Sequence, residues 1–204
     1  MRTRTLSNPF SCVQRFTKES WGAIFKDFNG NLDVEVGSGT GGFLLNYAQK
    51  NPDRSLVGFE IKAKLVDFIT NHINDKKLTN TKVFRSNAHY GLEDLFDDQS
   101  IDRIFIFHPD PWPKRDHQRR RVINNDFLKL AYQKLKPGGQ LYVSTDVPEL
   151  WDYIVQTINQ SNNQAKLFEY TQDQLFWETL YQTRWHEISL MRQKQLAYGT
   201  FKKN

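Results

Sequence analysis

The residues best suited to chemistry in this 204-residue sequence lie in one proline-rich segment, His108 to Arg121. Its three prolines fix the backbone φ angle and therefore hold the segment in one shape. Asp110 falls among these prolines, and Trp112 and Lys114 follow it closely. An aromatic ring beside cationic side chains suits a stacked nucleobase and its phosphate group. We therefore expect a rigid loop that contacts a nucleic acid, against the simpler alternative of a surface loop with a solvated basic face.

Basic side chains gather in this segment and near the C-terminus. Five Lys and Arg residues fall between Lys114 and Arg121, within a chain of formal net charge +5. Clustered positive charge attracts a polyanion more strongly than the same charge spread evenly. We expect the two histidines of the segment, His108 and His117, to pack or to contact phosphate rather than to bind a metal ion.

A glycine-rich turn follows the first apolar strand, in the run Glu35-Val-Gly-Ser-Gly-Thr-Gly-Gly42. Glycines allow a tight turn and the close approach of a ligand. The spacing also satisfies the G-x-G-x-x-G pattern of NAD enzymes, so an NAD-dependent oxidoreductase stays open. Glu35 favours S-adenosylmethionine, because an acid there can hold an ammonium group and would repel a pyrophosphate. Glu60, at the end of the second strand, could accept hydrogen bonds from ribose hydroxyls in either case.

A third polar turn, Ser86-Asn87-Ala88, follows the third expected strand. The side-chain oxygen of Asn87 could accept a hydrogen bond from the exocyclic amine of adenine. An asparagine that only forms the turn is the equally open alternative.

Short apolar strands alternate with amphipathic stretches along the chain, which predicts a parallel, doubly wound α/β sheet. Ligands bind beyond the carboxyl ends of the strands in such sheets, where the polar turns above are expected. Helices are expected over residues 43–50, from 65 to 73, over 126–135 and from Pro148. The expected strands are 32–36, 55–60, 82–85, 101–107 and 140–145, with closing strands at 164–170 and 195–202.

Composition narrows the class of protein. Hydrophobic residues make up 38% and charged residues 25% of the chain, which is typical of a single globular domain. No apolar run is long enough to span a membrane, and the N-terminus lacks the apolar core of a secretion signal. Cys12 is the only cysteine, so a disulfide within the chain is excluded and a cysteine zinc site is not expected. We expect a cytoplasmic protein without a metal site or a membrane segment.

These motifs together resemble one family. Pro-Asp-Pro-Trp-Pro-Lys114 followed by x-x-His-x-x-Arg-Arg, downstream of Glu35-Val-Gly-x-Gly-x-Gly and Gly58-Phe-Glu, is similar to the tRNA (guanine-N7)-methyltransferases of the bacterial TrmB type. The likeness extends from about Leu32 to the C-terminus. It implies a Rossmann-like fold of the class I methyltransferase type with an antiparallel C-terminal strand. It also implies methyl transfer from S-adenosylmethionine to N7 of a guanine in the variable loop of tRNA.

The resemblance assigns roles to individual residues. Asp110 is the implied catalytic residue, expected to orient and stabilise the guanine rather than to act as a base. The implied cofactor-binding residues are Glu35, Gly37, Gly39, Gly41, Glu60, Ile61, Asn87, Ala88 and Asp110. The implied tRNA-binding residues are Lys114, Asp116, His117, Arg119, Arg120, Arg121, Asp146, Thr183 and His186.

Two positions depart from the family. Asn87 stands where the family usually has aspartate, and His186 replaces the glutamate three residues after the threonine, with Glu187 one step later. In an extended segment a shift of one residue points a side chain to the opposite face. A methyltransferase with another substrate, or an RNA-binding relative with weakened catalysis, therefore stays open beside the tRNA methyltransferase.

The domain organisation expected from the sequence is simple. Residues 31–204 are expected to form one methyltransferase domain that acts as a monomer or a homodimer. Residues 1–30 are expected to form a basic arm, either a flexible tail or an additional RNA contact through Arg2, Arg4 and Arg15.

Overall fold

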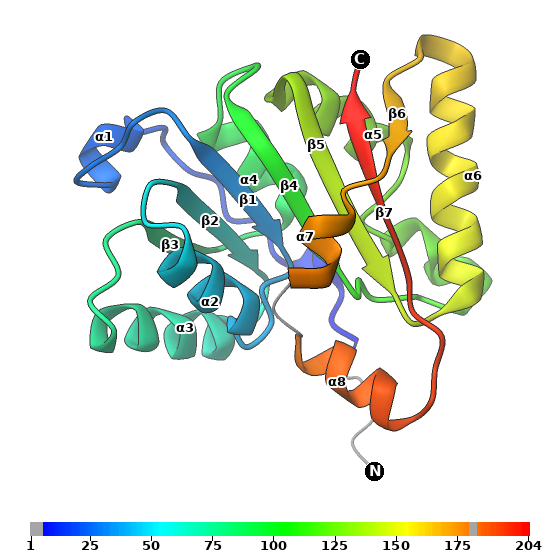
Figure 1. The fold of residues 1–204 in the computed structure, drawn as a ribbon, viewed down its shortest axis with the longest axis horizontal. Helices are drawn as coiled ribbons and strands as arrows, with labels where there is room; N and C mark the ends of the chain where they lie inside the picture. Colours follow the sequence, from blue (N-terminus) through cyan, green and yellow to red (C-terminus); the bar gives the residue numbers. More distant parts are fainter. Residues whose placement is uncertain (1–5, 180–182) are drawn as a thin grey trace.

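The computed structural model describes residues 6–179 and 183–204. These residues form a seven-stranded sheet with the strand order β3-β2-β1-β4-β5-β7-β6 and helices on both faces (Figure 1). The strands are β1 (Leu32–Val36), β2 (Ser55–Glu60), β3 (Thr81–Arg85), β4 (Ile101–Phe107), β5 (Leu135–Thr145), β6 (Phe168–Thr171) and β7 (Ala197–Lys203).

The directions of the strands confirm the predicted fold class. Strands β1 to β5 are parallel, and β7 is antiparallel to β5 and to β6. Every residue of β1 and β2 is buried, as expected for strands that are covered on both faces. The chain moves outward from β1 to β3 and then returns to place β4 beside β1. The strand order therefore reverses between β1 and β4, the position at which such sheets bind ligands.

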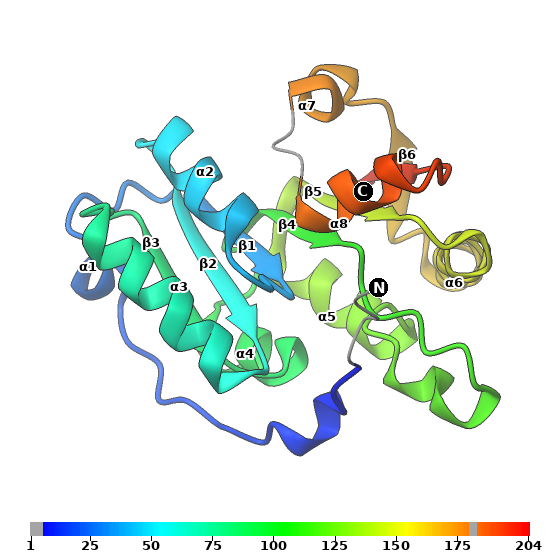
Figure 2. The same ribbon diagram turned by 90° about the horizontal axis from the view of Figure 1, so that it is seen from below.

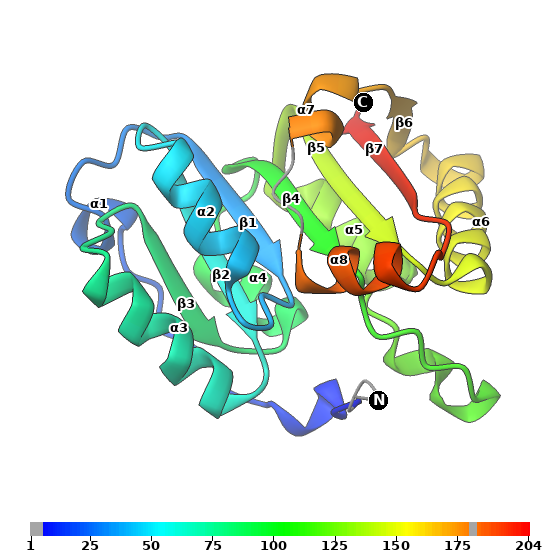
Figure 3. The same ribbon diagram turned by 60° about the horizontal axis from the view of Figure 1, so that its bottom comes forward.

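Two apolar clusters hold the helices on the sheet. One face carries α2 (Gly42–Lys50), α3 (Ala63–Asp75) and α7 (Gln174–Thr179), which pack around Phe105 and Tyr142. The other face carries α4 (Ala88–Leu95), α5 (Asn125–Lys134) and α6 (Pro148–Ala165), and the short α1 (Trp21–Ile24) joins it (Figure 2). Helix α8 (Arg184–Met191) lies apart from both faces, below the arrowheads of β4 and β5 in Figure 3.

The N-terminal segment runs along α4. Arg15 forms ion pairs with Asp94 and Glu93, at 2.5 and 2.9 Å. Trp21 and Phe25 are buried in the larger apolar cluster. The charge of Arg15 is thus already compensated by acids of α4. Arg2 and Arg4 lie outside the described residues.

The C-terminal third differs from the sequence expectation. The strand expected from Gln164 begins only at Phe168, because α6 continues to Ala165. The helix extends this far although its last turns are polar, since Ile158 and Ser161 are still buried against the domain. Helices α7 and α8 were not predicted. Helix α7 packs Phe176 against Phe105 and Tyr142 of the sheet, and a short sequence window does not reveal a contact between such distant residues.

Strand β5 also begins earlier than expected, at Leu135 rather than Gln140. It pairs with β4 at Ile101 and again at Arg103, and the four residues 136–139 lie between the two pairing positions. Gly138 adopts a φ of 74° within this irregularity, a conformation that glycine adopts at little cost. The Lys-Pro-Gly-Gly sequence therefore interrupts the pairing without ending the strand.

Candidate active site at the carboxyl edge of the sheet

A cavity of about 640 Å³ opens at the carboxyl ends of β1, β2, β3 and β4. Figure 3 brings this edge forward, with α8 and the N-terminal segment beside it. The predicted site residues that line the cavity are Glu35, Gly37, Gly39, Glu60, Ile61, Asn87, Ala88, Asp110, Arg119, Arg120, Arg121 and Thr183. The predicted residues outside its lining are Gly41, Lys114, Asp116, His117, Asp146 and His186.

The glycine-rich turn is fixed by backbone hydrogen bonds to the end of β2. The amides of Gly37 and Ser38 both donate to the carbonyl of Phe59, at 2.8 and 3.0 Å. Gly39 has a φ of 57°, which a residue with a side chain rarely adopts. Gly41 has a different role, because a Cβ there would lie 2.7 Å from the side chain of Ile69 on α3.

Glu60 ties this turn to the start of α3. One carboxylate oxygen accepts from the amide of Gly39 and the other from the amide of Lys62, both at 2.9 Å. Each oxygen keeps a second lone pair for a further donor. Burial raises the pKa of Glu60, while these two amides lower it. The carboxylate is therefore held at a set position on the cavity wall.

Glu35 is more deeply buried than Glu60, the other buried acid on the described wall of the cavity. Only 4% of its surface is exposed, and its Oε2 atom has no hydrogen-bond partner among the described residues. Burial raises the pKa of Glu35 to about 7; the nearby Ser38 hydroxyl lowers it and the charge of Glu60 raises it. A buried carboxylate without a partner is costly. An ammonium group in the cavity would pair with it, so the residues present fit the amino-acid end of S-adenosylmethionine.

The raised pKa of Glu35 predicts how stability depends on pH. The folded state keeps the proton up to about pH 7, whereas the unfolded state releases it near pH 4.5. This stabilisation is full below pH 4.5 and is lost as pH rises through 7, a change on the order of 3 kcal/mol. Glu35→Gln should remove that loss, as measured by urea unfolding of the ligand-free protein between pH 4.5 and 8. Glu169→Gln, an exposed acid on β6, is the control, and an equal pH dependence in Glu35→Gln and wild type would contradict the assignment.

Asn87 performs two structural roles at the cavity wall. Its side-chain oxygen accepts from the amide of His89 at 3.0 Å and so caps α4. Its amide group donates to the carbonyl of Pro9 at 3.2 Å. An aspartate could not make the second bond, which gives the Asn87 departure a physical reason. It also brings Pro9 and Phe10 into the lining of the cavity, a contribution for which the sequence offered no signal.

The loop after β4 is held by unusual backbone conformations and internal contacts. His108 and Trp112 have positive φ angles of 49° and 43°. Trp112 is only 4% exposed, and the guanidinium of Arg120 lies 5.0 Å from its ring centre. Arg120 and the loop therefore cover most of the Trp112 ring, although Trp112 is among the residues that line the cavity. Stacking of this ring on a base stays a prediction. Asp110 lies between these residues on the cavity wall, half-buried.

The basic run after this loop divides into exposed and buried members. Residues Arg115–Arg120 form a 3₁₀ helix within the green segment that projects from the body in Figures 2 and 3. Lys114, Asp116 and Arg119 are exposed on it, and His117 is half-buried. Arg121 is buried instead, where its Nε donates to the carbonyl of Pro111 at 2.9 Å. The basic run thus exposes Lys114 and Arg119 to solvent, while the buried Arg121 fixes the loop through its hydrogen bond to Pro111.

The segment that carries Thr183 and His186 is helical. Thr183 caps α8 by accepting from the amide of His186 at 3.2 Å. The expectation of an extended segment is wrong here, because this cap starts a helix at Arg184. A shift of one residue in a helix turns a side chain by about 100° rather than to the opposite face, so Glu187 does not simply face away from the site.

Asp146 lies behind the cavity wall. It is 8% exposed, with one oxygen 2.9 Å from Lys194 Nζ and the other 3.5 Å from His108 Nδ1. The ring of His108 meets the ring of His186 edge-on, with centroids 6.3 Å apart. Burial lowers the pKa of His186; the neighbouring His108 lowers it further, and Glu187 opposes this.

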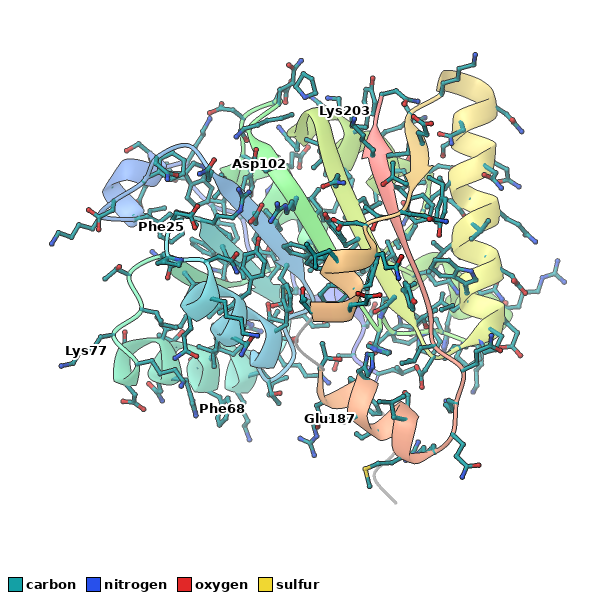
Figure 4. All side chains as sticks on the ribbon, viewed as in Figure 1. Phe25, Phe68, Lys77, Asp102, Glu187 and Lys203 are labelled. Carbon is teal, nitrogen blue, oxygen red and sulfur yellow. The ribbon has the colours of Figure 1, made fainter. Side chains whose placement is uncertain are left out.

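Other charged residues lie at the opposite edge of the sheet and serve the fold. Arg54 binds the fully buried Asp33 with two hydrogen bonds of 2.6 Å, and Lys136 binds Asp102 at 2.8 Å. Figure 4 shows Asp102 near the upper end of β4, far from Glu187 on α8. Across residues 6–179 and 183–204, no group of three or more metal-ligating side chains is assembled. None of the helices within these ranges is long and apolar enough to cross a bilayer.

The comparisons with known proteins agree with this geometry. A family model described as "Putative methyltransferase" matches residues 29–196. The tRNA (guanine-N(7)-)-methyltransferase of Nitrosomonas eutropha is 32% identical over 80% of this chain and 78% of its own length. The tRNA (guanine-N(7)-)-methyltransferase of Nitrosomonas europaea is 34% identical over 61% of this chain. The matched region covers 56% of that relative's own length.

Solved structures give the fold. The 16S rRNA methyltransferase KamB superposes with a TM-score of 0.63 at 16% identity, over 90% of this chain and 92% of its own. The glycine-rich turn alone is compatible with NAD or with S-adenosylmethionine. Membership of a methyltransferase family identifies the cofactor as S-adenosylmethionine. The chain belongs to the tRNA (guanine-N7)-methyltransferase family, within the class I S-adenosylmethionine-dependent methyltransferases.

Proposed function

We propose that this protein transfers a methyl group from S-adenosylmethionine to N7 of a guanosine in tRNA, with the variable loop as the implied target. The observation that carries the proposal is the cavity itself. It joins the buried Glu35 and the hydrogen-bonded Glu60 on one side to Asp110 and the basic loop on the other. A methyl-donor site and a polyanion-binding surface thus share one opening.

Catalysis in this site rests on positioning. S-adenosylmethionine supplies an electrophilic methyl group on a cationic sulfur when it is bound. Guanine N7 carries a free lone pair and no proton, so no base has to remove one before attack. The protein therefore has to hold the two reacting atoms in line. The guanine gains positive charge as it is methylated, and the Asp110 carboxylate on the cavity wall can stabilise that charge.

The cofactor residues have separable roles in this proposal. Glu35 holds the ammonium group, and Glu60 accepts from the ribose with its remaining lone pairs. Asn87 can accept from adenine through the second lone pair of the oxygen that caps α4. The target base has to leave its stack to reach Asp110. We place this activity in the cytoplasm, with the protein acting as a monomer or a homodimer and without a metal ion.

Nucleoside analysis of tRNA tests the function directly. The full chain is incubated with tRNA and methyl-labelled S-adenosylmethionine, and label is expected in 7-methylguanosine. The matched control is the same tRNA with 7-deazaguanosine at the target position, which has a carbon in place of N7 and should take no label. Label in another nucleoside would indicate a different substrate, and no label would indicate a binding protein without turnover.

The exposed half of the basic loop gives a second prediction. Lys114→Gln with Arg119→Gln should weaken tRNA binding and reduce the slope of log K against log salt by about 0.7 to 0.9 per lost phosphate contact. Both side chains are exposed on the projecting segment, so the change should leave the fold intact. The measurement is tRNA affinity between 50 and 200 mM salt, the range over which phosphate contacts weaken steeply.

Lysines at the opposite edge of the sheet provide the control for this prediction. Lys50 is the last residue of α2, Lys76 follows the end of α3, and both are exposed. Lys50→Gln with Lys76→Gln removes the same net charge far from the cavity. An equal loss of slope in both pairs would show a general charge effect and contradict a specific contact through the loop.

A further inference from the structure

His108 lies next to Asp110 on the wall of the cavity, and contacts from several parts of the chain fix its backbone and its ring. His108 directly follows β4 and has a φ of 49°, and its amide donates to the carbonyl of Ser144 at 2.8 Å. A positive φ is uncommon for a residue with a side chain and persists only where the surrounding structure enforces it. Such conformations concentrate at functional sites. We therefore expect the imidazole of His108 to have a functional role.

The two edges of this imidazole face different surroundings. The side chain is 2% exposed, and Nδ1 is fully buried, 3.5 Å from the carboxylate of Asp146. His108 nevertheless lines the cavity. Since Nδ1 faces the interior, the edge that reaches the cavity is the one that carries Nε2. A carboxylate beside Nδ1 favours the proton on that nitrogen and leaves Nε2 as a hydrogen-bond acceptor.

Asp146 is fixed in this supporting position from its other side. Lys194 donates to its second oxygen at 2.9 Å, and Asp146 itself does not line the cavity. His186 of α8 meets the His108 ring edge-on and limits its rotation. Among the described residues, His108 therefore stands between this carboxylate and the cavity, with His186 of α8 beside it.

We propose that His108 contacts the hydrogen-bonding edge of the target guanine through Nε2, and that Asp146 is a positioning residue that acts through His108. This inference rests on the proposed function and names the group that selects the base. Guanine presents N1–H and a 2-amino group as donors on that edge. Adenine presents an unprotonated N1 and no 2-amino group, and its one donor there is the 6-amino group, so the acceptor has to face N1 and C2. An acceptor on the cavity wall therefore favours guanine. It also supplies the acceptor that this chain lacks at position 186, where His186 stands in place of the family's glutamate.

Four variants of the full-length protein test the assignment: His108→Phe, His108→Gln, Asp146→Asn and the double variant His108→Phe/Asp146→Asn. Phenylalanine keeps a ring of similar shape without an acceptor, and glutamine keeps an acceptor. His108→Phe should lower kcat/KM for tRNA by about 30-fold, mainly through KM, as expected when a donor of the bound base is left without its hydrogen-bond partner. His108→Gln should restore most of this activity.

The double variant separates a positioning role from a direct contact. Asp146→Asn alone should lower kcat/KM by about 10-fold, and it should have no further effect in the His108→Phe background, since coupled residues are not additive. Equal effects of Asp146→Asn in both backgrounds would overturn the proposal, because Asp146 would then act independently of His108. The affinity for S-adenosylmethionine and the Tm of each variant establish that the fold is retained. If His108→Phe does not fold, the cycle is run with His108→Leu, which also lacks an acceptor.

Base discrimination provides a readout that a purely structural role would not change. Two tRNAs that differ only by guanosine or adenosine at the target are bound in the presence of S-adenosylhomocysteine, and the ratio of their Kd values is compared. His108→Phe should reduce this ratio by about 10-fold, consistent with one hydrogen bond of discrimination. An unchanged ratio would reject the contact. Absence of N7 methylation by the wild-type protein would instead reject the proposed function, so the two failures are distinguishable.

Discussion

Replacing Asp110 with alanine should lower methyl transfer to tRNA by about 100- to 1,000-fold, the usual effect of removing a group that stabilises charge in the transition state. Asp110 lies half-buried on the cavity wall, in a loop fixed by three prolines and by the internal contacts of Trp112 and Arg121. No other acid of this loop lines the cavity within the described residues. The loss should appear in kcat, because the carboxylate interacts most strongly with the guanine once it is positively charged.

The cofactor affinity of the same variant identifies the step that is affected. Asp110→Ala should bind S-adenosylmethionine within a few-fold of wild type, since Glu35 and Glu60 are unchanged. Asp53→Ala is the matched control, an exposed acid ahead of β2 at the opposite edge of the sheet. Undiminished transfer by Asp110→Ala would remove Asp110 from the mechanism. A parallel loss of transfer and cofactor binding would make it a binding residue instead.

The second large effect is expected at Glu60. Glu60→Ala should lower the affinity for S-adenosylmethionine by about 100-fold, because hydrogen bonds to a charged group contribute roughly 1.5–3 kcal/mol each. The change removes the proposed ribose acceptor. It also leaves the amides of Gly39 and Lys62 without their partner, so the glycine-rich turn loses its connection to α3. Calorimetric titration of the cofactor measures the effect.

A graded series separates the ribose contact from the support of the turn. Glu60→Gln keeps one acceptor oxygen but presents an NH₂ group to the other amide, so its affinity should fall between those of wild type and Glu60→Ala. Glu169→Ala, on the exposed face of β6, is the control. If Glu60→Gln and Glu60→Ala bind the cofactor as wild type does, the acid serves only the turn and the ribose assignment is wrong.

The parallel half of the fold could be predicted because it depends on local patterns. The apolar runs of β1, β2 and β4 and the glycines after β1 determine their own conformations, and their order determines where the strands end. The acids at the ends of β1 and β2 and the aspartate after β4 could therefore be assigned to one edge, and the structure brings Glu35, Glu60 and Asp110 to one cavity. The C-terminal third could not be predicted as well, because α7 packs Phe176 against Phe105 and Tyr142, which lie far from it in the chain.

The sequence by itself determined the class of sheet, the nucleotide-binding turn and the chemical composition of the loop after β4. It did so because glycine, proline and alternating apolar residues constrain the backbone near themselves. Only the tertiary structure decided which charged groups line the cavity and which lie buried behind its lining. It placed Trp112 and Arg121 inside the loop, directed Asp146 toward His108 and Lys194, and bonded Asn87 to Pro9. The contacts of Asp146 and Asn87 join residues far apart in the chain, and packing and the cost of burying unpaired charge select them.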